Sequence, residues 1–293
     1  MKIAFYGKSF GEEAIAYVQQ LFSKLELLET KLFIYKPFYE FLKKNNIVFI
    51  SEISLFSAAK ELKKPIDFMF SVGGDGTILD VITIVKDSGI PILGLNTGRL
   101  GFLSSISKDN CLEAIDNLIN KKYTIENRSL IRLETKDSFF GDLNFALNEV
   151  SIQKVESESL ITIKVNVNNE YLNSYWADGL IIATPTGSTG YSLSCGGPIV
   201  APESENFIIT PIASHNLTVR PIVIPDDNVI TLTVEVRSKV FLCGLDARKQ
   251  TIDSSVTLTI KKESFKINLV KLENENFFST IRNKLMWGID KRN

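Results

Sequence analysis

The sequence predicts an α/β plus all-β protein, with an N-terminal α/β domain followed by an antiparallel β domain. In the first third of the chain, short apolar runs alternate with apolar residues at helical spacing, which is typical of a parallel sheet covered by helices. From about residue 129 onward, apolar and polar residues alternate along β-branched stretches, which indicates antiparallel strands. The length of 293 residues also exceeds the roughly 100–200 residues of a single typical domain.

The α/β part begins with an expected strand at 2–6, where KIAFY forms a short apolar run. The elements expected after it are a helix at 12–28, a strand at 31–35, a helix at 54–62, a strand at 67–72, a helix at 76–89 that stops at Gly89, a strand at 91–96 and a helix at 109–120. Because strands and helices alternate in this order, we expect a Rossmann-like unit with a mostly parallel sheet.

The pattern changes near residues 121–128, where we place the domain boundary. Alternation then continues to the end of the stretch at 255–270 (SVTLTIKKESFKINLV), and the tail NENFFSTIRNKLMWG has the composition of a final helix. We therefore assign 1–125 to the α/β domain, 126–273 to the β-rich domain and 274–293 to a helical tail that packs back on the first domain.

Composition excludes several classes of protein. With 44% hydrophobic residues, 23% charged residues and a formal net charge of -1, the chain is typical of a globular protein and lacks the basic character of proteins that bind nucleic acid or acidic membranes. Its three cysteines, Cys111, Cys195 and Cys243, are too widely spaced for a zinc site and odd in number, so reduced thiols are expected. Neither a signal peptide nor a membrane span of ~20 apolar residues is evident, and we expect a cytoplasmic protein.

A glycine-rich turn, SVGGDGTILD, lies between an expected strand and an expected helix. Gly73, Gly74 and Gly76 would let a phosphate approach the backbone at the helix N-terminus, where Thr77 can add a hydroxyl donor. An aspartate there has two interpretations, because Asp75 can simply cap the helix or can take part in chemistry. The three surrounding glycines favour chemistry, since they are costly in conformational entropy unless something must come close.

A second glycine-rich block, DGLIIATPTGSTGYSLSCGGPIV, begins at Asp178 and continues to residue 200. A short apolar strand in it precedes a segment that contains Tyr191 and many neutral hydrogen-bonding groups, which suit sugars, amides and bases. These groups are the hydroxyls of Thr184, Thr186, Ser188, Thr189, Ser192 and Ser194. The alternative is a flexible surface loop, which such a composition often signals.

Four motifs together resemble those of the NAD kinase family. The pentapeptide GGDGT alone is shared with diacylglycerol and sphingosine lipid kinases and, more distantly, with 6-phosphofructokinases. The other three motifs are NTGRLGFL at 96–103, NEV at 148–150 and DGLIIATPTGSTGYS at 178–192. They follow GGDGT in the order that NAD kinases have, and diacylglycerol kinases and 6-phosphofructokinases lack the last of them.

The resemblance implies that the γ-phosphoryl group of ATP is transferred to the 2′-hydroxyl of the adenosine ribose of NAD, with Mg²⁺ carried by ATP. It implies that Asp75 is the catalytic base and that Asn148 and Glu149 hold the ribose and the adenine ring of the adenosine. Asp178 and the 184–194 segment would hold the nicotinamide half and the second face of the adenosine. The residues expected to contact substrates are Gly74, Gly76, Thr77, Asn96, Phe102, Asn148, Glu149, Asp178, Thr189, Gly190, Tyr191, Ser192, Ser194 and Arg248. A homodimer or homotetramer is implied as well.

Some positions depart from the family pattern or have a structural interpretation. Gly190 stands where bacterial members commonly have alanine. Trp176 stands where many members have a polar or basic residue, and Arg248 lies near a position often held by glutamine. These departures concern the edges of the NAD pocket. His215 is expected to be structural because it is a lone histidine in a β domain, and Cys195 because no base or lysine neighbours it in the sequence. Arg99 is a candidate for a phosphate contact or a solvated side chain.

Two alternative functions stay open at this point. A lipid or sugar kinase would use the same aspartate on another hydroxyl group, and would be distinguished by whether NAD or a lipid hydroxyl is consumed. A catalytically silent NAD-binding sensor would retain the NAD motifs, although a protein that only binds has no need of a carboxylate beside phosphates.

Overall fold

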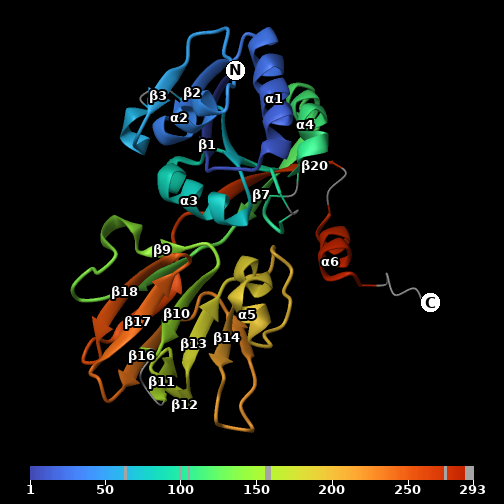
Figure 1. Cartoon of the computed structure of the whole chain (residues 1–293). Helices are drawn as coiled ribbons and strands as arrows, with labels where there is room; N and C mark the ends of the chain where they lie inside the picture. Colours follow the sequence, from blue (N-terminus) through green and yellow to red (C-terminus); the bar gives the residue numbers. More distant parts are fainter. Residues whose placement is uncertain (63–64, 99–100, 105, 156–159, 274–275, 288–293) are drawn as a thin grey trace. The chain divides into compact units, whose positions relative to one another are not determined.

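The computed structural model describes residues 1–62, 65–98, 101–104, 106–155, 160–273 and 276–287, and the chain divides into two compact units (Figure 1). Unit 1 consists of Met1–Asn127 together with the segment that begins at Ile267, and unit 2 is Arg128–Lys266. Within the described part of the chain, no helix is both long and apolar enough to cross a membrane.

Unit 1 is built on a mostly parallel sheet with the strand order β3-β2-β1-β4-β5-β20-β7, and β6 pairs with β5. Its strands are β1 (Lys2–Gly7), β2 (Lys31–Tyr35), β3 (Ser54–Phe56), β4 (Phe68–Val72), β5 (Ile92–Asn96), β6 (Ile106–Ser107), β7 (Tyr123–Arg128) and β20 (Ile267–Leu272). Its helices are α1 (Ile15–Leu27), α2 (Lys36–Lys44), α3 (Asp75–Val85), α4 (Cys111–Ile119) and α6 (Phe277–Leu285).

The central strands β4 and β5 are buried along their whole length, as expected for a parallel sheet covered on both faces. Helices α1 and α4 lie side by side (Figure 1) and contribute Leu21, Phe22 and Ile115 to the core, where Phe5 and Phe70 meet with ring centres 5.0 Å apart. The α/β character predicted for the first third of the chain is thus confirmed.

One predicted helix is wrong. The stretch 54–62 forms the short strand β3, whose Ser54 is paired in parallel with Phe33 of β2, followed by a single 3₁₀ turn. The helix between β2 and β3 is α2, at Lys36–Lys44, and the sequence analysis did not predict it. Pro37 stands in its first turn, where its fixed φ suits a helix start, and the spacing of Phe38 and Leu42 buries one face.

The alternating stretch at 255–270 is divided between the two units. Strand β19 (Leu258–Lys262) belongs to unit 2, whereas β20 enters the sheet of unit 1 beside β5, with Leu269 opposite Ile92. Helix α6 follows in unit 1, and Asn276 caps its N-terminus by accepting a hydrogen bond from the Ser279 N–H at 2.8 Å. Its Lys284 Nζ lies 5.8 Å from the centre of the Phe102 ring.

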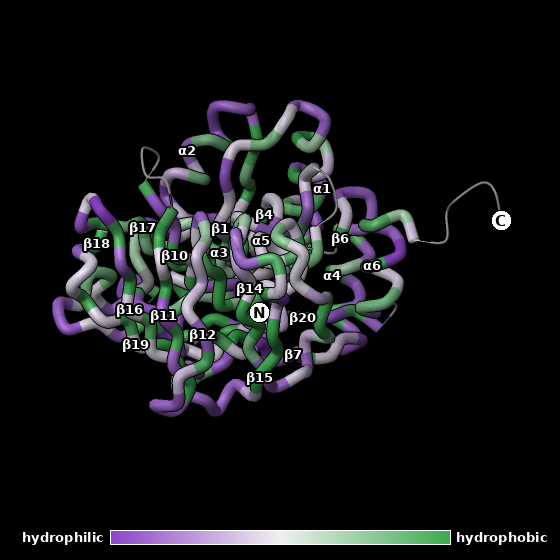
Figure 2. Tube along the Cα trace, turned by 90° about the horizontal axis from the view of Figure 1, so that it is seen from below, coloured by the Kyte–Doolittle hydropathy of each residue, from purple (hydrophilic) through white to green (hydrophobic). Residues whose placement is uncertain are grey.

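Unit 2 consists of two antiparallel sheets, ordered β15-β14-β13-β10-β17-β18 and β12-β11-β16-β19-β8-β9. The strands not yet given are β8 (Ile131–Glu134), β9 (Phe145–Ala146), β10 (Glu149–Gln153), β11 (Ile161–Val167), β12 (Glu170–Ala177), β13 (Gly179–Ala183), β14 (Asn206–Ile212), β15 (Ile222–Pro225), β16 (Ile230–Glu235), β17 (Val240–Leu245) and β18 (Arg248–Asp253). The hydropathy colour changes repeatedly along the chain of this unit, with green hydrophobic segments among purple hydrophilic ones (Figure 2). Residues from both sheets, among them Ile163, Ile182, Leu232 and Phe241, share one core.

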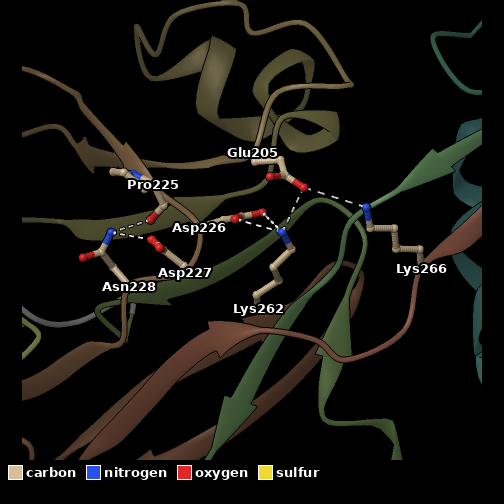
Figure 3. Close-up of polar contacts among 7 residues, drawn as sticks. All are labelled: Glu205, Pro225, Asp226, Asp227, Asn228, Lys262 and Lys266. Carbon is tan, nitrogen blue, oxygen red and sulfur yellow. Dashed lines mark hydrogen bonds and ion pairs between the residues drawn. The ribbon is translucent and has the colours of Figure 1, made fainter.

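A cluster of charged residues joins the two sheets of unit 2 at one edge (Figure 3). Lys262 at the end of β19 lies 3.0 Å from buried Asp226 and 3.4 Å from Glu205, which is also 3.9 Å from Lys266. Burial alone would lower the pKa of Lys262, but the hydrogen bond and charge of Asp226 outweigh it and raise the pKa. A buried carboxylate without a partner is costly, and Lys262 supplies that partner to Asp226.

Candidate active site

The GGDGT turn lies where the buried strand β4 ends and α3 begins, and Gly74 is the N-cap residue. Gly73 has a φ of 151°, and a Cβ there would collide with the Thr77 hydroxyl, so glycine is required. Gly74 and Gly76 are exposed, and nothing lies within 4 Å of where their Cβ atoms would be. The turn therefore offers open space beside the N–H groups of a helix N-terminus, which suits a phosphate.

The Asp75 carboxylate is held by a turn that is distant in sequence. Its Oδ2 accepts the Phe102 N–H at 2.8 Å, and its Oδ1 accepts the N–H groups of Leu103 at 3.0 Å and Ser104 at 2.9 Å. No side-chain hydrogen bond caps α3, so the capping interpretation of Asp75 is not supported. Each carboxylate oxygen has two lone pairs, and Oδ2 accepts one N–H in this arrangement, which leaves a lone pair for a substrate proton.

The turn at 101–104 is held in place by buried groups of unit 1. Asn96 is 2% exposed, and its Nδ2 donates to the Ser104 hydroxyl at 2.8 Å while its Oδ1 accepts the Gly98 N–H at 2.7 Å. A Cβ on Gly101 would collide with the Asp75 carboxylate. Asn96 thus supports the turn that holds Asp75. Arg99 lies outside the described residues.

In unit 2, the structure brings the Asn-Glu pair together with the second glycine-rich block. Thr184, just after β13, donates its N–H to the Asn148 carbonyl at 2.8 Å and its hydroxyl to the Leu147 carbonyl at 2.6 Å. A Cβ on Gly190 would lie 3.4 Å from Oε2 of Glu149, which places that carboxyl beside the block. These two motifs, separate in the sequence, therefore form one local arrangement.

Most hydroxyls of the block are used within the fold. Thr184, Thr186, Ser188 and Ser192 are buried, and the Ser192 hydroxyl, for example, is bonded to that of Thr210 at 2.8 Å. These side chains shape the loop. Tyr191 is 38% exposed and Ser194 is exposed as well, whereas Thr189 and Gly190 are partly buried.

The other expected contact residues of unit 2 have partners of their own. Asp178 forms an ion pair with Lys154 at 2.7 Å. Arg248 donates hydrogen bonds to the Leu143 and Phe145 carbonyls, so its guanidinium braces the chain that leads into the Asn-Glu pair. Trp176 is exposed and its ring centre lies 5.5 Å from that of His215.

Glu149 has an unusual electrostatic environment. Its Oε2 is buried and has no hydrogen-bond partner among the described residues. Burial, together with the charge of nearby Asp246, raises the pKa of Glu149 from 4.5 to about 8. Asp246 was missed from the sequence, where the only signal was an aspartate between two strands in GLDARKQ. Glu149 therefore retains its proton at neutral pH.

We expect the Glu149→Gln variant to lose a pH dependence of stability that the parent shows. Between pH 4.5 and about 8 the unfolded chain releases a proton that folded Glu149 keeps, so the parent's free energy of unfolding falls as pH rises. At pH 8 the free energy of unfolding of the variant should exceed that of the parent by roughly 1–4 kcal/mol, because each unit by which the pKa is raised corresponds to about 1.4 kcal/mol. Urea unfolding at several pH values measures this. Glu170→Gln, at an exposed position in β12, should follow the parent, and parallel curves for Glu149→Gln would mean that folded Glu149 is ionised.

Comparison with known proteins gave consistent matches along the chain. Residues 32–123 match the family model of the ATP-NAD kinase N-terminal domain, and residues 147–272 match that of the C-terminal domain. The NAD kinases of Cytophaga hutchinsonii and Flavobacterium psychrophilum are 47% and 46% identical to this chain, in both cases over 100% of each chain.

Two solved structures resemble this one in fold. An NAD kinase from Archaeoglobus fulgidus in complex with ATP is 28% identical with a TM-score of 0.74, and the match covers 98% of this chain and 99% of that one. Yeast NADH kinase complexed with NADH has a TM-score of 0.87 at 21% identity, covering 98% of this chain and 88% of that one. The predicted fold class is confirmed by both.

Proposed function

We infer that this chain, which belongs to the ATP-NAD kinase family, is a phosphotransferase that converts NAD to NADP with ATP as the donor. The family resemblance predicted from the four motifs is confirmed by the matches of both domains. Relatives that are 47% and 46% identical over their whole length and are named NAD kinase support the activity. Within the structure, the observation that carries the proposal is the Asp75 carboxylate, fixed beside an exposed helix N-terminus with one lone pair available.

In the proposed reaction, the 2′-oxygen of the ribose forms a bond to the γ-phosphorus of ATP, and the bond between this phosphorus and ADP breaks. Oδ2 of Asp75 accepts the proton that the 2′-hydroxyl loses. The transition state of phosphoryl transfer is loose, so positioning contributes more than basicity. The N–H groups of Phe102, Leu103 and Ser104 supply this positioning by fixing the carboxylate. Gly74 and Gly76 leave room for the phosphates at the start of α3.

The described side chains around Asp75 do not form a metal site of their own, so a divalent cation would have to be bound by the substrate ATP. Both oxygens of Asp75 already accept N–H groups, and the described side chains include no group of three or more His, Cys, Asp or Glu suited to a metal ion. Mg²⁺ favours phosphate oxygens and water over an all-protein cage, and when bound with ATP it would neutralise charge on the transferred group. The cytoplasmic location and the homodimer or homotetramer stay predictions.

We propose that NAD is bound mainly by unit 2. Asn148 and Glu149 would hold the adenosine ribose and base, since an unpartnered buried carboxyl oxygen gains a hydrogen bond there. Tyr191 is exposed enough to stack on a base, and Ser194, Thr189, Gly190 and Asp178 complete the set of contacts. Ser192, with its hydroxyl bonded to Thr210, and Arg248, with its guanidinium bonded to backbone carbonyls, would act by holding this segment in place.

The function is tested by offering the protein ATP, Mg²⁺ and NAD and identifying the product by mass spectrometry. We expect NADP from NAD and no phosphorylated product from the 2′-deoxyadenosine analogue of NAD. The analogue should still bind, weaker by about 1–3 kcal/mol because a partner of the missing hydroxyl is left unpaired. Phosphate on the analogue would show that another hydroxyl is the acceptor, and consumption of a lipid hydroxyl in place of NAD would favour the lipid kinase alternative.

A further inference from the structure

The turn between β17 and β18 reaches across to the Asn-Glu pair through Asp246, whose φ is 53°. The Asp246 carboxylate accepts the N–H groups of Leu147 at 2.9 Å, Asn148 at 2.8 Å and Glu149 at 3.3 Å. Its own N–H donates to the Glu149 carbonyl at 3.1 Å. One side chain thus satisfies three consecutive backbone donors of the segment that carries two expected NAD contacts.

The same segment is held by the second glycine-rich block through its carbonyl groups. Thr184 binds the carbonyls of Leu147 and Asn148, so donors and acceptors of the backbone are engaged by two different parts of unit 2. By contrast, Oε2 of Glu149 is buried and has no hydrogen-bond partner among the residues that the structure describes. An unpaired buried oxygen is costly. The fold therefore fixes the backbone firmly and presents one side-chain group to a ligand.

We propose that Asp246 is a positioning residue for the dinucleotide, and that it holds the backbone of Leu147–Glu149 so that Asn148 and Glu149 meet the adenosine part of NAD. Charge-assisted hydrogen bonds from three N–H groups to one carboxylate are strong and directional, which suits a segment whose side chains must stay within a fraction of an ångström of a ligand. This inference rests on the proposed function, because it assigns NAD as the ligand of the pair.

Asp246 also sets the charge of Glu149. Burial raises the pKa of Asp246, and its three N–H donors and the cation of Arg248 oppose that rise only in part. The charge of Asp246, when it is ionised, raises the pKa of Glu149 further. Among the described residues, Tyr191 and Cys195 are also titratable groups near Glu149, and both are neutral at pH 7 because burial raises the pKa of each. Glu149 keeps the proton, and a protonated carboxyl can donate a hydrogen bond to a ribose oxygen or a ring nitrogen as well as accept one.

The test compares three variants of the full chain. In Asp246→Ala, the KM and the dissociation constant for NAD should rise about 10- to 100-fold, as expected when a binding group is displaced by about 1 Å, with a smaller fall in kcat and no change in the KM for ATP. In Asp246→Asn, the amide oxygen can still accept the Asn148 and Glu149 N–H groups, so affinity should be partly retained. Asp253→Ala is the control, because Asp253 also binds turn atoms at the other end of β18, those of Ser255.

Two further readouts separate positioning from a general loss of stability. In the ligand-free protein, the amides of residues 147–149 should exchange with solvent at least about 10-fold faster in Asp246→Ala than in Asp253→Ala. The pH at which NAD affinity changes with the protonation of Glu149, about 8 in the parent, should move to lower pH in Asp246→Asn, since the neighbouring charge is gone. A variant that had only lost stability would keep this pH.

The inference is overturned if both Asp246 variants bind NAD as the parent does. It is also overturned if NAD binding is lost while the exchange rates of the amides of residues 147–149 and the pH at which NAD affinity changes stay as in the parent. Should Asp246→Ala not fold, Asp246→Asn carries the test by its pH transition and amide exchange. The proposed function and the positioning role of Asp246 are tested by different measurements. A parent that makes no NADP contradicts the proposed function, whereas the amide exchange of residues 147–149 is decided without any ligand.

Discussion

The Asp75→Asn variant should lose about 10²- to 10⁴-fold in kcat while its affinity for NAD stays close to the parent's, as is typical when a general base is removed. The amide oxygen can still accept the Leu103 and Ser104 N–H groups that bind Oδ1, so the shape of the turn is largely kept. The amide nitrogen cannot accept the 2′-hydroxyl proton. Turnover with saturating ATP and NAD, and NAD titration by calorimetry, measure the two quantities.

The control for this variant is Asp80→Asn, on the same helix. Asp80 is paired with Lys8 at 2.6 Å and lies farther along α3, away from the turn at 101–104. Its amide variant should keep turnover near that of the parent. If Asp75→Asn also kept near-parental turnover, Asp75 would have the structural role of binding the Phe102–Ser104 backbone, and another group would have to take the proton.

The Gly101→Ala variant should lose about 10²-fold or more in turnover without any change to a group that reacts. A Cβ at this position would collide with Oδ1 of Asp75, so either the carboxylate or the turn must move. A displacement of about 1 Å in catalytic geometry can cost about 10²-fold. Breaking hydrogen bonds to the carboxylate should also lower the free energy of unfolding by about 1–3 kcal/mol. Kinetics and thermal unfolding measure these effects.

Gly98→Ala is the matched control in the same loop. A Cβ on Gly98 would lie 4.0 Å from Oδ1 of Asn96, an ordinary van der Waals distance, so this variant should have nearly parental turnover. A Gly101→Ala variant as active as Gly98→Ala would contradict the inference that the close approach of backbone and carboxylate is needed. It would mean that the turn can shift without moving Asp75.

The local pattern of the sequence was enough to predict the fold class but not the partner of every strand. Alternation of strands and helices correctly indicated a parallel sheet in unit 1. In the short stretch 54–62, however, the spacing of apolar residues does not distinguish a helix from a strand. This stretch begins with a strand because it pairs with β2. Likewise, the alternation through 255–270 indicates strands but contains no information on which sheet each strand joins, and β20 joins the sheet of unit 1.

For the site, the motifs could be placed because glycine-rich turns at the ends of strands are local features. GGDGT does follow a buried strand and open a helix. What could not be read is which side chains are used within the fold. The bond between Ser192 and Thr210 and those from Asp246 to Leu147–Glu149 join residues far apart in the chain. Such bonds depend on the register of paired strands, which one sequence does not specify.

Strand β20 has a consequence for the order in which the protein folds during synthesis. In the sheet of unit 1 it lies between β5 and β7, yet the ribosome makes it only after the whole of unit 2. Unit 2 can therefore be complete while the edge of the earlier sheet at β5 is covered only in part, by the two-residue strand β6, and the uncovered part is a template to which other nascent chains can pair. A chain that stops before Ile267 lacks the strand that joins β5 to β7, so a strand translated after unit 2 completes the sheet that was begun before it.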